Sequence, residues 1–147
     1  MRLVEIDILC AYARSFLGVP YRFGGRNRLE GFDCSQFVTE LMISQGLVLH
    51  GTDLSAQGLF DHFLPLNLKN TIAPGPGAIA FYGKNADSIS HVAFCLTAET
   101  IIEAGGGDHT TVELASAIAR SACVRERPIK YRKDFFCALT PVYDRNS

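Results

Sequence analysis

The sequence lacks the features that would place it among nucleic-acid-binding, membrane-spanning or disulfide-stabilised proteins. With 14 Lys and Arg against 15 Asp and Glu, its formal net charge is -1, so it has no strong positive field to attract nucleic acid or an anionic membrane. No apolar run approaches the roughly 20 residues of a membrane span. The 5 cysteines are odd in number and form no Cys-x-x-Cys pair, which argues against a disulfide framework and against a zinc site.

The first ten residues also lack the pattern of a secretory signal peptide. They carry Glu5 and Asp7 among their apolar positions. Cysteines without a pairing pattern favour reduced thiols, and hence synthesis and folding in a reducing compartment. We therefore expect a protein that is made in the cytoplasm. It would reach a substrate outside the cytoplasm by a non-classical route, either as part of a virion or by release to the cell wall.

The chain carries helical patterns first and strand patterns later. Apolar residues recur at helical spacing over 3–17, 34–45 and, for a short helix, 54–63. After Pro74-Gly75-Pro76-Gly77 the pattern becomes that of strands, expected over 77–82, 89–97, 100–104, 123–127 and 135–142. The polar run 26–30 is expected to be a surface loop, and a Thr110–Glu113 capping box is expected to begin a helix over 111–122. Neither half is large enough for a good core of its own, so we predict one α+β domain over 1–147.

One cysteine is placed where a helix is expected to begin. Asp33 is a good N-cap, Gln36 stands at the N3 position of a capping box, and Phe32 and Phe37 occupy the positions of a hydrophobic staple. Cys34 would then be the first helical residue, where unsatisfied N–H groups and the helix dipole favour a thiolate. The other interpretation is a buried structural cysteine, and the capping pattern alone leaves both open.

A catalytic thiolate needs an imidazole, and the imidazole needs a group to orient it. The expected hairpin 89–104 offers His91 and Glu103. A turn centred on Thr97 would place the two directly opposite each other, with Cβ atoms about 4.5 to 5.5 Å apart. A shift of one residue would move Glu103 to the other face. His109, beside the glycine run, is the second choice for the third position, and a half-buried histidine without chemistry is the alternative interpretation of His91.

Five blocks, in order, resemble the signature blocks of the NlpC-type cell-wall peptidases. They are Val19-Pro20-Tyr21-Arg22-Phe23-Gly24-Gly25, Gly31-Phe32-Asp33-Cys34-Ser35, Pro76-Gly77-Ala78-Ile79-Ala80-Phe81, Ser90-His91-Val92-Ala93-Phe94 and Ile102-Glu103-Ala104. The resemblance implies a papain-like α+β fold, with N-terminal helices packed on a central antiparallel sheet. It also implies hydrolysis of amide bonds in peptidoglycan stem peptides or muropeptides, usually between D-glutamate and the diamino acid, without a metal or organic cofactor.

The resemblance assigns roles residue by residue. Cys34 matches the nucleophile and His91 the base, and Glu103 occupies the third polar position, which is often histidine in the family. Tyr21 matches a tyrosine beside the nucleophile that contacts the substrate or the oxyanion. Ser35 matches a residue near the substrate amine, and we place Asp33 with these two in the substrate-binding set. Ala78 stands where the family usually has an acidic residue.

The sequence leaves open the biological setting of the protein and an alternative, non-catalytic function. A non-catalytic wall-binding protein or phage tail component would keep the same cleft without turnover. A phage-encoded hydrolase, with phage tail proteins as partners, is favoured over a cytoplasmic muropeptide recycler or an antibacterial effector. That preference rests on the resemblance of Glu103-Ala104-Gly105-Gly106-Gly107-Asp108 and of the segment 127–139 to phage-borne relatives.

Overall fold

The computed structural model describes residues 3–67 and 73–143, so residues 1–2, 68–72 and 144–147 of the predicted 1–147 domain lie outside the described residues. The helices are α1 (Leu3–Arg14), α2 (Cys34–Ser44), α3 (Ala56–Phe63) and α4 (Leu114–Ala119), with a 3-10 turn at Pro65–Asn67. The strands are β1 (Arg26–Asn27), β2 (Gly31–Phe32), β3 (Ile79–Gly83), β4 (Ile89–Cys95), β5 (Thr100–Gly105), β6 (Cys123–Pro128) and β7 (Phe135–Leu139). None of the helices within the described ranges has the length and apolar character needed to cross a bilayer.

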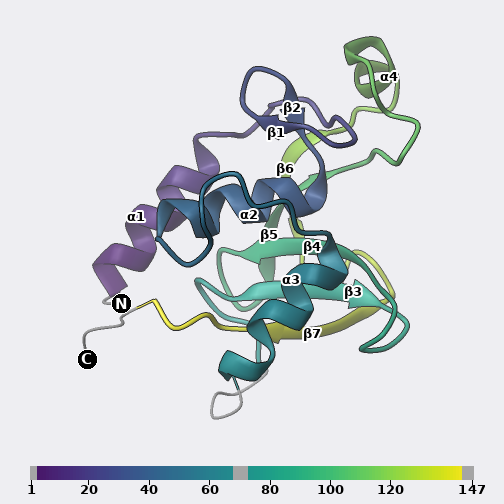
Figure 1. Cartoon of the computed structure of the whole chain (residues 1–147). Coiled ribbons are helices and arrows are strands. Elements are labelled where there is room, and N and C mark those ends of the chain that lie inside the picture. Colours follow the sequence, from purple (N-terminus) through teal and green to yellow (C-terminus); the bar gives the residue numbers. More distant parts are fainter. Residues whose placement is uncertain (1–2, 68–72, 144–147) are drawn as a thin grey trace.

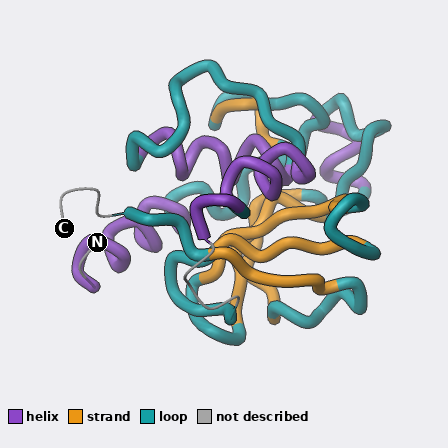
Figure 2. The backbone as a smooth tube through the Cα atoms, turned by 60° about the horizontal axis from the view of Figure 1, so that its bottom comes forward, coloured by secondary structure: helices purple, strands orange, loops and turns teal. Residues whose placement is uncertain are grey.

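Strands β3 to β7 form an antiparallel sheet in the order β6-β5-β4-β3-β7. Strands β3 to β6 follow one another as neighbours, and β7 returns to pair with β3 on the other side (Figure 1). Helices α2 and α3 lie over one face of this sheet (Figure 2), α1 packs beside α2, and α4 stands apart on the connection between β5 and β6 (Figure 1). The predicted α+β fold, with N-terminal helices on an antiparallel sheet, is confirmed.

Helix α2 is fixed against the sheet by its apolar side chains. Phe37, Val38 and Leu41 have no exposed surface, and they share one core cluster with Val92 of β4 and Ile102 of β5. Burying each large apolar side chain contributes about 1.5 to 3 kcal/mol relative to leaving it in water. The first turn of α2 is thereby held in a defined place relative to β4 and β5.

A second, smaller cluster covers the other face of the sheet. It contains Ala80 and Tyr82 of β3, Ala93 of β4 and Ile101 of β5, and Tyr131 packs against it. Because side chains alternate along a strand, Glu103 extends from β5 on the same side as Ile101. The sheet is therefore buried on both faces around the end of β5.

Several predicted elements differ from the structure in their bounds; the strands expected over 89–97 and 135–142, for example, end at Cys95 and Leu139. The first helix ends at Arg14 rather than at 17, because the next residues form turns and the N–H of Gly18 donates to the carbonyl of Val124 in β6. The helix expected over 111–122 covers only Leu114–Ala119, and the Thr110 hydroxyl donates to Asp108 instead of capping it. The expected loop 26–30 is part of a small hairpin formed by β1 and β2.

Candidate active site

The N-terminus of α2 has the predicted cap. Oδ1 of Asp33 accepts a hydrogen bond from the N–H of Gln36 at 2.9 Å, and Oδ2 accepts one from the N–H of Gly24 at 2.9 Å. Cys34 is the first helical residue and is half-buried. The first N–H groups of a helix have no partner inside it, and the positive end of the helix dipole lies beside them. Cys34 is thus placed in an environment that favours negative charge.

The hydrophobic staple is also present, but the capping box is not. The rings of Phe32 and Phe37 meet edge to face, with centroids 5.8 Å apart. The side chain of Gln36 donates to a carboxylate oxygen of Asp53 instead of returning to Asp33. This contact connects the first turn of α2 to the segment just before α3. Ser55 of that segment lines the same cleft as Cys34.

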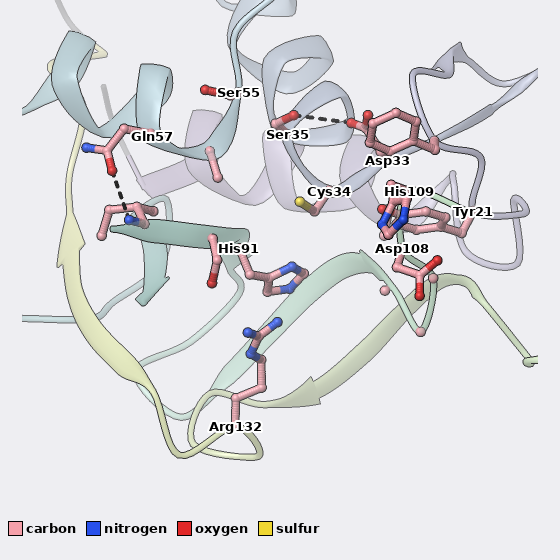
Figure 3. Close-up of a pocket in the computed structure, with 18 of the residues that line it drawn as sticks. Tyr21, Asp33, Cys34, Ser35, Ser55, Gln57, His91, Asp108, His109 and Arg132 are labelled. Carbon is pink, nitrogen blue, oxygen red and sulfur yellow. Dashed lines mark hydrogen bonds between the residues drawn. The ribbon is translucent and has the colours of Figure 1, made fainter. Parts of the chain in front are cut away.

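A cleft of about 410 Å³ opens at the start of α2 (Figure 3). Of the predicted site residues, five line it directly: Tyr21, Asp33, Cys34, Ser35 and His91. Glu103 lies behind His91 and has no exposed surface. Other lining residues that we did not predict come from α3, β4, the loop after β5 and the segment after β6, and they include Gln57, Ser90, Gly107, Asp108, Tyr131 and Arg132. Residues from widely separated segments therefore meet in one cleft.

His91 and Glu103 are in contact, although the hairpin register is not the predicted one. Nε2 of His91 lies 2.7 Å from Oε1 of Glu103. Phe94 faces Ile102, whereas a turn centred on Thr97 would place it opposite residue 100, so the predicted register is wrong by two residues. Because the side-chain period of a strand is two, that shift keeps Glu103 on the face of His91, and the carboxylate reaches the imidazole diagonally.

Two further side chains hold Glu103, and neither contact was predicted from the sequence. Nε of Arg125 donates to Oε2 at 3.0 Å, and the hydroxyl of Tyr131 donates to Oε1 at 2.5 Å. Arg125 stands opposite Glu103 in the β5–β6 ladder. Both strands were predicted, so a contact between Arg125 and Glu103 could have been considered. Nothing in the two segments specifies which residues of the two strands face each other. Tyr131 lies in the basic turn after β6, which carries no signal of this contact.

The charges of the pair follow from its partners. Burial lowers the pKa of His91, but the neighbouring Cys34 and then Glu103 raise it by more than burial lowers it. The pKa of His91 is therefore raised to about 9. Burial raises the pKa of Glu103, and the hydrogen bonds and charges of His91, Tyr131 and Arg125 outweigh it, so that the pKa is lowered overall. At neutral pH an imidazolium and a carboxylate therefore lie beside Cys34.

We expect the stability of the protein to fall as the pH rises above about 6.5, because the pKa of His91 is raised from 6.5 to about 9 on folding. A group that binds its proton more tightly in the folded state stabilises the fold fully below its unfolded pKa. That contribution is lost as the pH rises through the folded pKa. Urea unfolding between pH 6.5 and about 8, below the range in which unfolded thiols ionise, measures the slope. The H91Q variant should not show this fall in the free energy of unfolding with pH. If its free energy of unfolding falls with pH as steeply as that of the parent, the fall does not come from His91.

Tyr21 and Ser35 flank Cys34 in the cleft as the motif match implies. Burial raises the pKa of the Tyr21 hydroxyl, and the nearby Cys34 and Asp33 raise it further, so the hydroxyl stays protonated and can donate a hydrogen bond. The hydroxyl of Ser35 donates to Oδ1 of Asp33 at 3.2 Å. These side chains present a donor and a carboxylate to the cleft that Cys34 lines (Figure 3).

We expect G107A to damage the cleft because Gly107 packs directly on the ring of Tyr21. A Cβ at position 107 would overlap three ring carbons of Tyr21, so the ring or the loop must move. Overpacking of this kind costs about 1 to 3 kcal/mol. The midpoint temperature of thermal unfolding and kcat/KM should both fall. The matched control is G75A, since Gly75 has no heavy atom within 4 Å of the new Cβ; equal behaviour of the two variants would contradict a role for this contact.

His109 lines the cleft but does not support His91. Its ring packs edge to face against Phe23, with centroids 6.5 Å apart. The contact that orients the imidazole comes from Glu103. Of the two candidates for the third position, the structure therefore brings Glu103 to His91.

The fold and the cleft together define a class of protein: an α+β domain in which a cysteine at a helix N-terminus shares a cleft with a buried histidine–carboxylate pair. The model of the NlpC/P60 family matches residues 18–127. The chain therefore belongs to the NlpC/P60 family, as its signature blocks indicate.

Individual relatives agree with this membership. A gamma-DL-glutamyl hydrolase of Bacillus subtilis (strain 168) is 29% identical over 107 residues, which are 71% of this chain and 24% of that protein. The chain thus spans about a quarter of the length of this curated relative. A structure from Staphylococcus aureus subsp. aureus Mu50, described as similar to lipoprotein of the NLP/P60 family, superposes with a TM-score of 0.67 at 18% identity, covering 98% of this chain and 43% of that one.

A shorter solved domain matches over nearly its whole length. The NlpC/P60 domain of the peptidoglycan hydrolase SagA has a TM-score of 0.60 at 20% identity, and the alignment covers 92% of this chain and 97% of that domain. At this level of identity the likeness shows the fold. It supports the order of helices and strands described above.

Proposed function

We propose that the protein is a cysteine peptidase, or amidase, that hydrolyses amide bonds in peptidoglycan stem peptides. The observation that carries the proposal is the cleft shared by Cys34, at the start of α2, and His91, whose imidazole is held at 2.7 Å by the buried Glu103. Nucleophile, acid–base group and orienting carboxylate are the three parts that thiol acyl transfer needs. Membership of the NlpC/P60 family supports the same reaction class.

The reaction proceeds through a thioester. The thiolate of Cys34 attacks the amide carbonyl carbon, and the N–H groups at the start of α2 stabilise the resulting oxyanion. The imidazolium of His91 gives its proton to the leaving nitrogen, the C–N bond breaks and the amine departs. His91 then takes a proton from water, the hydroxide attacks the thioester, and the C–S bond breaks to return the thiolate and release the acid.

We infer that the scissile bond joins D-glutamate, through its side-chain carboxyl, to the diamino acid. The name of the Bacillus subtilis relative, gamma-DL-glutamyl hydrolase, supports a glutamyl bond. Asp33 and Ser35 line the cleft beside Cys34 in the sequence with a carboxylate and a hydroxyl, which suits a substrate amine, and the protonated hydroxyl of Tyr21 suits a carbonyl oxygen or oxyanion. The phage setting, the phage tail partners and the route out of the cytoplasm stay predictions.

Mass spectrometry of purified muropeptides incubated with the protein tests the proposal. Fragments that end in D-glutamate, absent when C34A is used instead, are the expected result. Cleavage at another bond would overturn the glutamyl specificity and keep the reaction class. Intact muropeptides together with intact polymeric peptidoglycan would overturn the proposal, and binding without cleavage would favour the non-catalytic wall-binding protein.

A further inference from the structure

The carboxylate of Glu103 is held on both of its oxygens by donors other than His91. Nε of Arg125 lies 3.0 Å from Oε2, and the hydroxyl of Tyr131 lies 2.5 Å from Oε1, the oxygen that also faces His91. The side chain of Glu103 has no exposed surface, and that of Arg125 is 21% exposed. Water screens such charges weakly, so the guanidinium offsets much of the charge of the carboxylate.

This arrangement is part of the sheet rather than a chance meeting of flexible side chains. Arg125 faces Glu103 directly in the β5–β6 ladder. A Cβ at Gly105 would overlap the Glu103 carboxylate and would lie 3.2 Å from Nε of Arg125, so glycine leaves the space that the pair occupies. The ring of Tyr131 is supported by that of Tyr82, with centroids 6.4 Å apart. Backbone register and packing therefore both hold the two donors on Glu103.

The charge of Glu103 matters for proton transfer. In the reaction proposed above, His91 must give a proton to the leaving amine and then take one from water. An acid–base group works best when its pKa is near the working pH. A carboxylate buried against an imidazole, with nothing to offset it, would hold the proton on His91 too strongly. A second cation on the far oxygen weakens that hold, and a donor on the shared oxygen weakens it further.

We propose that Arg125 and Tyr131 are positioning residues that keep Glu103 in the rotamer that reaches His91, offset its charge, and so set how readily His91 releases its proton. The proposal rests on the proposed function, because it takes His91 as the acid–base group. Arg125 lies behind Glu103 and outside the lining of the cleft, so it acts through Glu103 and not on the substrate.

Other titratable or charged groups also face the pair, and they are kept constant in the test. They are Cys34 from α2, Tyr82 from β3, and Arg132 and Asp134 from the segment before β7. Arg132 and Asp134 neutralise each other through two hydrogen bonds of 2.9 Å. Cys34 is the ionisable group beside His91 in the cleft, so it is replaced by alanine in the titrations.

The experiment follows the NMR signal of the His91 Cε1–H against pH in the C34A protein, with the signal assigned by its loss in H91Q. R125M should raise the titration midpoint by about one pH unit, because a cation close to the pair is removed. R125K, which keeps the charge, should restore most of the parental midpoint. Y131F should raise the midpoint by a smaller amount. With Cys34 present, kcat should fall in R125M by about tenfold, while KM stays near the parental value.

The matched control is R14M, which removes an exposed guanidinium from Glu126 of the same strand β6 and should leave the midpoint unchanged. A folded R125M or Y131F protein whose midpoint and kcat both equal those of the parent would overturn the proposal. If R125M does not fold, Y131F and R125K carry the test, because both keep a positive charge at position 125. The titration needs no turnover, so a protein that cleaves neither muropeptides nor polymeric peptidoglycan would refute the proposed function and leave this result standing.

Discussion

Replacing Cys34 by alanine is expected to lower kcat/KM by roughly 10⁴ to 10⁶, because the nucleophile of a thioester mechanism has no substitute among the other groups of the cleft. Removing the nucleophile of such a unit costs almost as much as removing the whole unit. The fold should be unchanged, since Cys34 is half-buried at the first position of α2 and its replacement leaves the Asp33 cap in place. Steady-state hydrolysis of the muropeptide, beside circular dichroism of the variant, measures both.

The control for this variant is C123A. Cys123 is also half-buried and unpaired, but it lies in β6, away from the cleft lining. Its loss should change kcat/KM by no more than about twofold, as is usual for substitutions away from the core and the site. The rate of thiol alkylation is a second measurement, and Cys34 should react faster than Cys123. Burial raises the pKa of Cys95 to about 12 and that of Cys137 to about 11, so these thiols should be inert. Full activity of C34A would end the assignment.

Replacing Glu103 by alanine is expected to cost both stability and turnover. Its carboxylate is fully buried and accepts hydrogen bonds from Tyr131 and Arg125 besides its contact with His91. Removing one partner of a buried ion pair typically costs about 3 to 5 kcal/mol, because the remaining charge is left without a partner. We therefore expect a clear loss of stability in urea, together with a fall in kcat/KM of about 10² to 10³ as His91 loses its orienting group.

The isosteric variant E103Q separates the two effects. Its amide oxygen can still accept from one donor, so it should unfold at a urea concentration between those of the parent and E103A. Its turnover should stay low because the negative charge beside His91 is gone. If E103A unfolded at the parental urea concentration and kept the parental kcat/KM, Glu103 would be neither a structural nor a positioning residue.

The structural expectation for E103A differs from what the sequence alone suggests. On a strand read by itself, Glu103 is a solvated or half-exposed residue whose loss leaves the fold intact. Arg125 and Tyr131 change that, since they come from β6 and the turn after it, 22 and 28 residues further along the chain. Contacts over such distances depend on strand register, and alternation of apolar residues sets the face of a strand but not its partner.

Local interactions made the nucleophile predictable. The Asp33 cap, the Phe32–Phe37 staple and the position of Cys34 at the first turn all follow from residues within a few positions of one another, and all three are present. The capping box failed because Asp53, which lies 17 residues away from Gln36, competes for its side chain. The amide of Gln36 has both donors and an acceptor, so it pairs with the partner that the tertiary structure brings to it.

The sequence by itself determined the helix that carries Cys34, the strand that carries His91, the α+β class and the face that His91 shares with Glu103. Each of these depends on spacing along the chain: capping over one turn, helical periodicity, and the two-residue period of a strand, which kept Glu103 on the right face even though the register was wrong by two. Only the tertiary structure decided the diagonal contact between His91 and Glu103, the clamp formed by Arg125 and Tyr131, and the packing of Tyr21 on Gly107. Those depend on strand pairing and loop paths, which are set by the packing of the whole core rather than by any local segment.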